Sequence, residues 1–380
     1  MNETVRKATW LELFYDLIFV VAIAKTVHTL GHAHSGQIEF DTYFKYVLIM
    51  IPLWWAWTGH TLFANRFDTD DALQRVMTLA QMVAAASLSM FIDIDFDPNY
   101  HGFLLSYVAI RGLLVLMYGR AAMLADGANK DVARFLGLGF TAGLLISLSS
   151  LFFEGSWKYV VLYLGIVVDI MIPLCGRRYL ARAPVESHHM PERYALLTII
   201  LLGESVANLV AAFESVSVSV QTVVAALAGF TLIAAIWWIY YDNLERRIYG
   251  RALGTGQAVI YLHLAIFIGL GGIATMIRFA IEPVLALADY KLLAGLSMAV
   301  FLIALQLLLQ VYHPKAERGP LLRNAVIAFL LAVAALAIAP TNLTVLLAMT
   351  GVFVVHAVTD ARRRRVLVTP PDSLADKSPP

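Results

Sequence analysis

The chain has 380 residues, of which 60% are hydrophobic and 14% are charged. Soluble domains carry roughly 25% charged residues, so this composition excludes a water-soluble protein. A formal net charge of +1 excludes a nucleic-acid-binding protein, and a single cysteine, Cys175, excludes an intramolecular disulfide or a cysteine-rich metal module. We therefore expect an integral membrane protein with several spans.

The apolar stretches have the length of membrane-spanning helices. A hydrocarbon layer about 30 Å thick needs about 20 mostly apolar residues per helix. Twelve such segments follow one another and predict an all-α polytopic fold: 9–31, 42–64, 72–94, 102–121, 134–153, 157–176, 191–213, 218–241, 256–280, 284–312, 322–339 and 342–361. The proline-containing residues 367–380 predict a disordered tail.

The positive charges predict how the chain is oriented. Short loops rich in Lys and Arg stay in the cytoplasm. The N-terminus, the even-numbered loops and the C-terminus hold 22 of the 28 Lys and Arg residues, so we expect both termini in the cytoplasm. A cleaved signal peptide is the alternative for the N-terminus, but Glu12 and Asp16 interrupt its apolar run.

Two landmarks recur in the two halves of the chain. ELFYDLIFVVAI begins at Glu12 and is followed by a Trp-Trp pair at Trp54, near the predicted cytoplasmic end of its helix. ERYALLTIILLGES begins at Glu192 and is followed by a second pair at Trp237. The pattern predicts two six-helix repeats, residues 1–185 and 186–366, in the same orientation about an axis along the membrane normal. A duplicated bundle without a pore is the alternative.

Ionisable residues inside membrane helices are costly and need a partner or a water-filled cavity. Glu12 and Asp16 lie four residues apart on one face of the first helix. They are either acids stabilised by the helix dipole and a neighbouring Arg, or the lining of a cytoplasmic ion vestibule with one protonated carboxyl group. Arg111 and Asp169 predict an ion pair that locks the first repeat, with a proton relay through Asp169 as the alternative.

Lys25 and Glu204 occupy equivalent positions in the two predicted repeats. Lys25 follows Glu12 by 13 residues and Glu204 follows Glu192 by 12, so each lies about 20 Å along its helix at roughly 1.5 Å per residue. If these two helices face each other, the side chains form an intramembrane ion pair. The alternatives are a separate polar pocket for each residue, or a Lys25 side chain that extends to the outer surface.

Motifs for cofactors and metals are weak in this sequence, and we expect no cofactor. His28 and His32 have the i, i+4 spacing of a metal pair, but a solvated rim is the competing interpretation. The run NRFDTDD at 65–71 lacks the glycine of a calcium loop, and Asp70 or Asp71 is better explained as a helix N-cap. GLGG at 269–272 predicts close helix packing. His60 and His263 are expected to be hydrogen-bonded core residues.

ELFYDLIFVVAI, ANRFDTDDALQR and ERYALLTIILLGES resemble the bacterial low-temperature-requirement A family over nearly all of residues 9–365. The resemblance implies a multi-pass protein of the bacterial inner membrane, without naming a substrate. Lys25 departs from the family pattern, in which a neutral polar residue is commoner. The resemblance marks the following residues: Glu12, Asp16, Asn65, Arg66, Asp68, Asp70, Asp71, Glu192, Gly203, Glu204 and Ser205. Asp242, which follows the second Trp-Trp pair, is a further candidate residue.

FYDLIFVVAI at 14–23 is more loosely similar to the Phe-Ser-Asp motif of the endolysosomal and bacterial potassium-channel family. Tyr15 replaces the Ser, and the second half has Tyr194-Ala195-Leu196 at the corresponding position. That similarity implies six-helix repeats with cytoplasmic termini and a gate of apolar side chains on the first helix.

Together these patterns predict a channel or secondary transporter for a small ion, with a proton or a monovalent cation as the first choice. Glu204 is expected to be its central titrating group and Asp16 its cytoplasmic one. Its partners would be the lipid bilayer and the ion, without nucleic acid, and a homodimer is an open alternative. A membrane enzyme that acts on a lipid head group through Glu12 and Asp16, or Asp70 and Asp71, is a second hypothesis. A third hypothesis is a structural or stress protein that transports nothing and affects membrane properties in the cold.

Overall fold

The computed structural model describes residues 7–31, 40–93, 95–247, 256–313 and 315–368. Over these ranges the chain forms thirteen α-helices and one 3-10 turn, η1 (Ser150–Phe152), with no strand. The helices are α1 (Trp10–Leu30), α2 (Phe40–Phe67), α3 (Ala72–Met90), α4 (Phe96–Leu124), α5 (Gly127–Ser149), α6 (Ser156–Cys175), α7 (Arg177–Leu180), α8 (His189–Glu214), α9 (Val220–Arg247), α10 (Gln257–Ile281), α11 (Leu287–Tyr312), α12 (Lys315–Ile338) and α13 (Asn342–Val368).

Each of the twelve predicted segments coincides with one long helix, and the predicted all-α polytopic fold is confirmed. In the described part of the chain, eleven helices are long and apolar enough to cross a membrane. The other long helix, α3, contains Gln74, Arg75 and Gln81, which make it less apolar. The start of α4 is earlier than predicted because Pro98 lies in its first turn, where a missing backbone N–H costs nothing.

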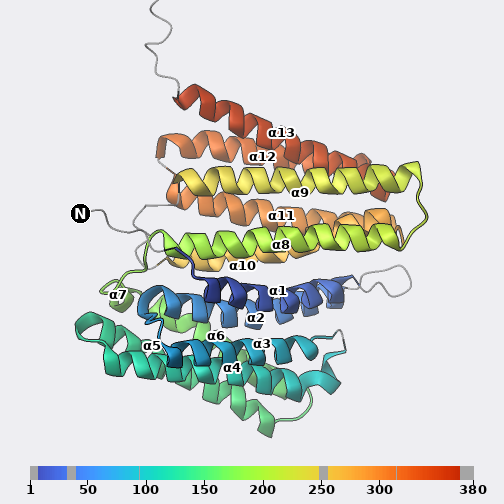
Figure 1. Ribbon diagram of the computed structural model, residues 1–380. Coiled ribbons are helices and arrows are strands. Elements are labelled where there is room, and N and C mark those ends of the chain that lie inside the picture. Colours follow the sequence, from blue (N-terminus) through green and yellow to red (C-terminus); the bar gives the residue numbers. More distant parts are fainter. Residues whose placement is uncertain (1–6, 32–39, 94, 248–255, 314, 369–380) are drawn as a thin grey trace, which may run out of the picture.

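The long helices lie roughly side by side, with α1 to α6 in one half of the bundle and α8 to α13 in the other (Figure 1). Helix α1 begins, and α13 ends, at the same end of the bundle, which we call the N-terminal end. Neighbours in the first half are α1–α2, α1–α3, α3–α4, α4–α5 and α5–α6. The corresponding neighbours in the second half are α8–α9, α8–α10, α10–α11, α11–α12 and α12–α13.

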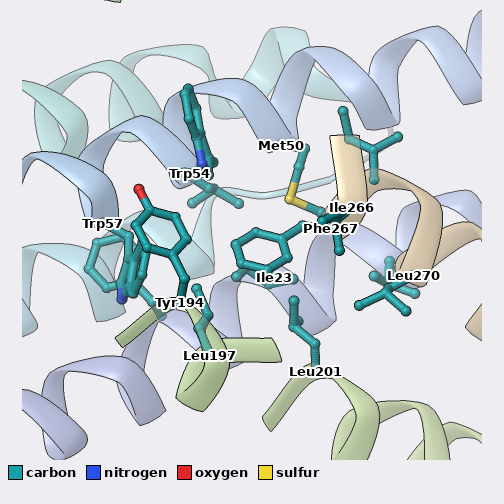
Figure 2. Packing of buried hydrophobic residues seen from close by; sticks show 14 of the residues in the cluster. Ile23, Met50, Trp54, Trp57, Tyr194, Leu197, Leu201, Ile266, Phe267 and Leu270 are labelled. Atoms are coloured by element: carbon teal, nitrogen blue, oxygen red, sulfur yellow. The ribbon is translucent and has the colours of Figure 1, made fainter. Parts of the chain in front are cut away.

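The two halves meet where α1 and α2 pack against α8 and α10. Figure 2 shows apolar side chains from these four helices filling the junction, among them Ile23, Trp54, Leu201 and Phe267. The Tyr46 hydroxyl donates a hydrogen bond to the carbonyl of residue 268 over 2.9 Å and joins α2 to α10. The centre of the bundle is therefore a packed apolar layer.

Glycines bring α10 close to its neighbours, as the GLGG run predicted. A Cβ atom on Gly269 would lie 2.8 Å from the backbone nitrogen of Phe301 on α11. A Cβ atom on Gly272 would collide with the Ser297 hydroxyl, also on α11. The run is a helix-packing surface.

The two Trp-Trp pairs have different surroundings. Trp54 and Trp55 are buried in the middle of α2, not near its end as expected. Trp237 and Trp238 are exposed on α9 at 45% and 52%. The two pairs therefore do not play the same packing role.

Candidate functional site

A buried ionic network joins the two halves of the molecule near the N-terminal end. Arg193, in the second turn of α8, is fully buried and contacts two acids of α1. Its Nη2 lies 2.6 Å from Asp16 Oδ1, and its Nη1 lies 2.9 Å from Glu12 Oε1. Asp16 is fully buried and Glu12 is 4% exposed, so one guanidinium group serves two carboxylates that water scarcely reaches.

Glu12 also holds the start of α1. Thr9 is the N-cap residue, and its backbone N–H donates to Glu12 Oε2 over 2.8 Å. The Glu12 backbone N–H donates in return to the Thr9 hydroxyl over 3.3 Å, which completes a capping box. The interpretation of the two acids as a helix start supported by an Arg is thus confirmed for Glu12, while Asp16 lies one turn deeper.

His189 extends the network to α2. Asn65 Oδ1 accepts a hydrogen bond from the backbone N–H of Glu186 over 2.9 Å, which fixes the orientation of the Asn65 amide. The Asn65 NH2 group then lies 3.1 Å from His189 Nδ1, which must accept. The Nε2 of a neutral His189 therefore carries the proton and donates to Glu12 Oε2 over 3.2 Å.

Aromatic and hydroxyl groups surround the inner side of the network. Trp57 donates from Nε1 to Asp16 Oδ1 over 2.7 Å, and its ring packs edge to face against Tyr194. The Tyr194 hydroxyl is hydrogen-bonded to Thr58 over 3.0 Å. Figure 2 shows Trp57 and Tyr194 next to each other at the edge of the apolar layer. The network therefore borders directly on the packed centre of the bundle.

Two predicted core histidines are hydrogen-bonded, as expected. His60 Nδ1 lies 2.8 Å from Gln81 Oε1, and the His60 ring stacks on Tyr15. His263 Nε2 lies 2.7 Å from the Tyr240 hydroxyl, and its Nδ1 lies 2.6 Å from the carbonyl of residue 259. Both residues are buried polar groups with partners.

A cavity of about 20 Å³ lies beside the network at the N-terminal end. Its lining includes the buried Glu12 and His60, the half-buried Asp68, and the exposed Asp70 and Arg75. One water molecule needs about 10–15 Å³ of such volume and two or more polar partners. The cavity therefore has room for a water molecule beside Glu12.

The residues of the NRFDTDD run have separate roles around that cavity. Asp71 is the N-cap of α3, accepts from the backbone N–H of Gln74 over 3.0 Å and pairs with Arg120. Hydrogen bonds from the Thr69 hydroxyl, the Gln74 amide and Arg120 hold the pKa of Asp71 well below its ordinary value. The predicted N-cap is thus confirmed.

Asp70 and Arg66 complete the run. The hydrogen-bonded Arg75 guanidinium, 3.0 Å away, lowers the pKa of Asp70. Asp70 has a positive φ of 48°, a conformation that Asp tolerates better than most residues. Asp68 Oδ1 accepts from the Asp70 backbone N–H over 3.2 Å. Arg66 donates from Nε to the carbonyl of Ala183, so the end of α2 is tied to the segment before α8.

The predicted ion pair between Arg111 and Asp169 is confirmed. Arg111 Nη2 lies 2.7 Å from Asp169 Oδ2, and both side chains are buried. A Cβ atom on Gly59 would collide with the Arg111 guanidinium, and one on Gly143 would collide with the Asp169 carboxylate. Two glycines therefore make the space that this pair occupies inside the first half.

The expected pair between Lys25 and Glu204 is not formed within the chain. Among the described residues, Lys25 has neither an ion pair nor a hydrogen bond and is exposed on α1. Glu204 is half-buried on α8, and its Oε1 accepts from Asn208 over 3.3 Å. Lys25 is exposed and Glu204 is half-buried, so neither side chain is enclosed between the two helices.

The remaining candidate residues have local partners. The Ser205 hydroxyl donates to the carbonyl of residue 201 over 3.0 Å, within α8. Glu192 Oε2 accepts from the backbone N–H of Ala8 over 3.3 Å. Asp242 accepts from Trp238 Nε1 over 3.2 Å. None of these three reaches the ionic network through a contact that the described residues make.

The weak metal site is not assembled in the part of the chain that the structure describes. His32 lies outside the described residues, and His28 is exposed near the end of α1. No group of three or more His, Cys, Asp or Glu residues close enough to hold a metal ion occurs within the described ranges.

A larger cavity, of about 540 Å³, lies between α2, α4 and α6 and is lined by residues such as Phe44, Asp95 and Tyr163.

Sequence reasoning missed Arg193 and His189, the residues that bring the two acids together across the halves. Arg193 was counted with the positive charges that set the orientation, because it lies close to the predicted start of its helix. Its position directly before the mostly apolar run YALLTIILLG, next to Glu192, was the available signal. His189 gave no signal, because its role depends on how Asn65 packs against it.

The fold and the network define a polytopic helical membrane protein whose two halves are joined by buried charges. The chain belongs to a family described as bacterial low temperature requirement A protein, whose model matches residues 7–358. It is also 26% identical over 272 residues to a protein of Rhizobium meliloti (strain 1021) described as uncharacterized. The match covers 67% of this chain and 63% of that relative, so the chain spans less than two thirds of its length.

Proposed function

We propose that the chain is a channel or secondary transporter for a small ion, with the proton as the first candidate, and that the buried network is its ion-binding site. The observation that carries the proposal is that Glu12 and Asp16 share Arg193 at the contact between α1 and α8. Ionisable groups inside a membrane bundle mark ion and proton pathways. Two carboxylates around one fixed cation leave one negative charge without compensation, and a proton or a monovalent cation can neutralise it.

The small cavity supplies the route from one surface. Its lining includes the exposed Asp70, the half-buried Asp68, and the buried Glu12 and His60. A proton that enters here reaches Glu12, which lines the cavity. Arg193 keeps its own proton, so it couples Glu12 to Asp16 only through charge, because both carboxylates share its guanidinium group. The route needs no carboxylate exposed to lipid.

On the far side of the network the packed apolar layer blocks any ion. Ile23, Leu201 and Phe267 fill the junction between the halves (Figure 2). The structure is therefore a closed state in this account, and passage requires α1 to move relative to α8. The ion pairs that hold these two helices together would change with the protonation of Glu12 or Asp16.

We also propose that the N-terminal end of the bundle faces the cytoplasm of a bacterial inner membrane. The distribution of Lys and Arg supports this orientation. The matching neighbour relationships of α1–α6 and α8–α13 support two six-helix repeats in the same orientation. The cytoplasmic side would then supply the proton.

The hypothesis of a lipid-head-group enzyme is less well supported. A cavity of about 20 Å³ beside Glu12 is far below the roughly 300–1,000 Å³ of typical small-molecule sites. Asp70 and Asp71 are engaged with Arg75 and Arg120 at the start of α3. The contacts of these two carboxylates support a role in holding the start of α3.

Purified chain in lipid vesicles tests the proposal. Vesicles with a pH-sensitive dye inside and an imposed pH gradient should lose that gradient faster with the chain than without it, and matched K⁺ and Na⁺ gradients identify the ion. Faster loss of a K⁺ or Na⁺ gradient alone would replace the proton with that cation. Equal rates in protein-containing and empty vesicles for all three ions would contradict transport.

A further inference from the structure

Helices α1 and α8 present one continuous outer face. Helix α1 is packed against α2, α3, α8 and α10, and α8 against α1, α2, α9 and α10, so each retains one uncovered side. Figure 1 shows the two helices next to each other on the same side of the bundle. This α1–α8 face includes the exposed Leu17, Lys25, Gly203, Ala207 and Ala211 and the half-buried Glu204.

The face contains two opposite charges at similar depths. The contact between Asp16 and Arg193 fixes the register of the two helices, which run in the same direction. Lys25 is nine residues beyond Asp16 and Glu204 is eleven beyond Arg193, so they lie about 14 Å and about 17 Å further along at roughly 1.5 Å per residue. An ammonium group and a carboxylate on a lipid-facing surface are both costly without a partner.

We propose that this face binds a second copy of the chain, so that Lys25 of each copy pairs with Glu204 of the other. A twofold axis along the membrane normal preserves depth and makes both contacts equivalent. Gly203, Ala207 and Ala211 follow one another at intervals of four residues on α8 and let a neighbouring helix approach closely. The proposal does not depend on which ion, if any, the protein transports.

The proposal explains both side chains that the fold of one chain leaves unexplained. Lys25 is exposed yet lies inside the span Trp10–Leu30, and Glu204 has only an amide of its own helix as a hydrogen-bond partner among the described residues. The ion pair expected from the sequence would then form between chains instead of within one. In this interchain pair, each charge would be neutralised by its partner, so neither would face lipid alone.

Charge reversal in two differently tagged chains provides the test. Lys25→Glu alone, or Glu204→Lys alone, places like charges at both contacts of a homodimer, whereas a mixed dimer of the two variants has opposite charges at both. We expect native mass spectrometry from lipid nanodiscs to detect wild-type dimers, monomers of each variant, and a mixed dimer after co-expression. Glu154→Lys, an exposed charge reversal away from this face, should remain dimeric.

A pair formed within one chain predicts the opposite result, because co-expression cannot repair like charges that lie in the same chain. Monomeric wild type, or absence of the mixed dimer, would overturn the proposal. If a charge-reversal variant does not fold, cysteine cross-linking provides a second test in a Cys175→Ser background. A disulfide between one chain with Lys25→Cys and a differently tagged chain with Glu204→Cys supports the interface, and its absence under oxidising conditions contradicts it.

Discussion

Arg193 is the residue on which the contact between the halves depends. It is fully buried, and it is the cation shared by Glu12 and Asp16. Removal of one member of a buried ion pair leaves its partners charged in a medium of low dielectric constant. At the scale of the residue, this arrangement makes the loss of Arg193 more damaging than the loss of any surface Arg.

Arg193→Gln should therefore lower the free energy of unfolding by about 3–5 kcal/mol, the usual range for breaking a buried ion pair. Thermal unfolding in detergent measures the effect as a lower midpoint. Arg178→Gln, which removes an exposed Arg, should leave the midpoint close to that of the wild type. Similar midpoints for the two variants would show that the pair does not hold the halves together.

Asp71 provides a prediction about pH. Hydrogen bonds from Thr69, Gln74 and Arg120 depress its pKa in the folded chain below the ordinary value of about 3.9. A depressed pKa contributes stability that is present above about pH 4 and is lost as the pH falls toward the folded-state pKa. Asn at this position also caps helices, so Asp71→Asn removes the charge and keeps the cap.

The difference in thermal midpoint between wild type and Asp71→Asn should therefore be largest near pH 6 and shrink as the pH falls below about 4. Unfolding at a series of pH values in one detergent measures it. A difference that stays constant from pH 6 to pH 3 would mean that the charge of Asp71 does not contribute through its hydrogen bonds.

The candidate site shows how far single residues can be predicted from the sequence. Glu12 and Asp16 were identifiable because acids interrupt an apolar run, and their identity as a pair on one face follows from their spacing. Arg193 and His189 were not, because the sequence does not say which residues of α8 meet α1. A contact between residues about 180 positions apart depends on packing, which periodicity does not determine.

Among the elements, α5 and α6 form a contact that is sensitive to side-chain size. Gly143 of α5 lies against the Asp169 carboxylate, and a Cβ atom on Gly165 of α6 would lie 2.6 Å from the carbonyl oxygen of Gly143. Small residues at such positions let helix backbones approach closely. Here they also position Asp169 for its ion pair with Arg111.

Gly143→Ala should displace Asp169 and destabilise the chain by about 1–3 kcal/mol, the range for overpacking a tight core. Gly119→Ala is the matched control, because nothing lies within 4 Å of the added Cβ in the last two turns of α4. The control should be neutral or stabilising by up to about 1 kcal/mol, since Ala is the better helix former. Unfolding midpoints compare the two, and equal midpoints would contradict the role given to Gly143.

Helix boundaries were predicted well where apolar composition changes abruptly and less well at prolines. The starts of α4 and α12 were placed several residues too late because proline was treated as a break. Both prolines lie in the first two turns of their helices, where few intrahelical hydrogen bonds are lost. The outward direction of Lys25 and Glu204 was also missed, because equal depth does not define which way a helix is rotated.

For the whole molecule, the sequence predicts the class of fold but not the arrangement of its halves. Apolar length alone identifies the membrane helices. That α1 and α2 meet α8 and α10 around a packed apolar layer follows only from the structure (Figure 2). In our account this layer closes the protein, and the ionic network beside it is the proton-binding site.

Proton flux through vesicles containing network variants tests this account most directly. Glu12→Gln retains the shape of the side chain but cannot ionise, and it should slow the loss of a pH gradient at least about tenfold, the effect of about 1.4 kcal/mol on the barrier. Glu192→Gln makes the same change at a half-buried acid of α8 outside the network and should stay within about twofold of the wild type. Wild-type flux no faster than in empty vesicles, or equal flux through Glu12→Gln and wild type, would contradict the proposed role of the network.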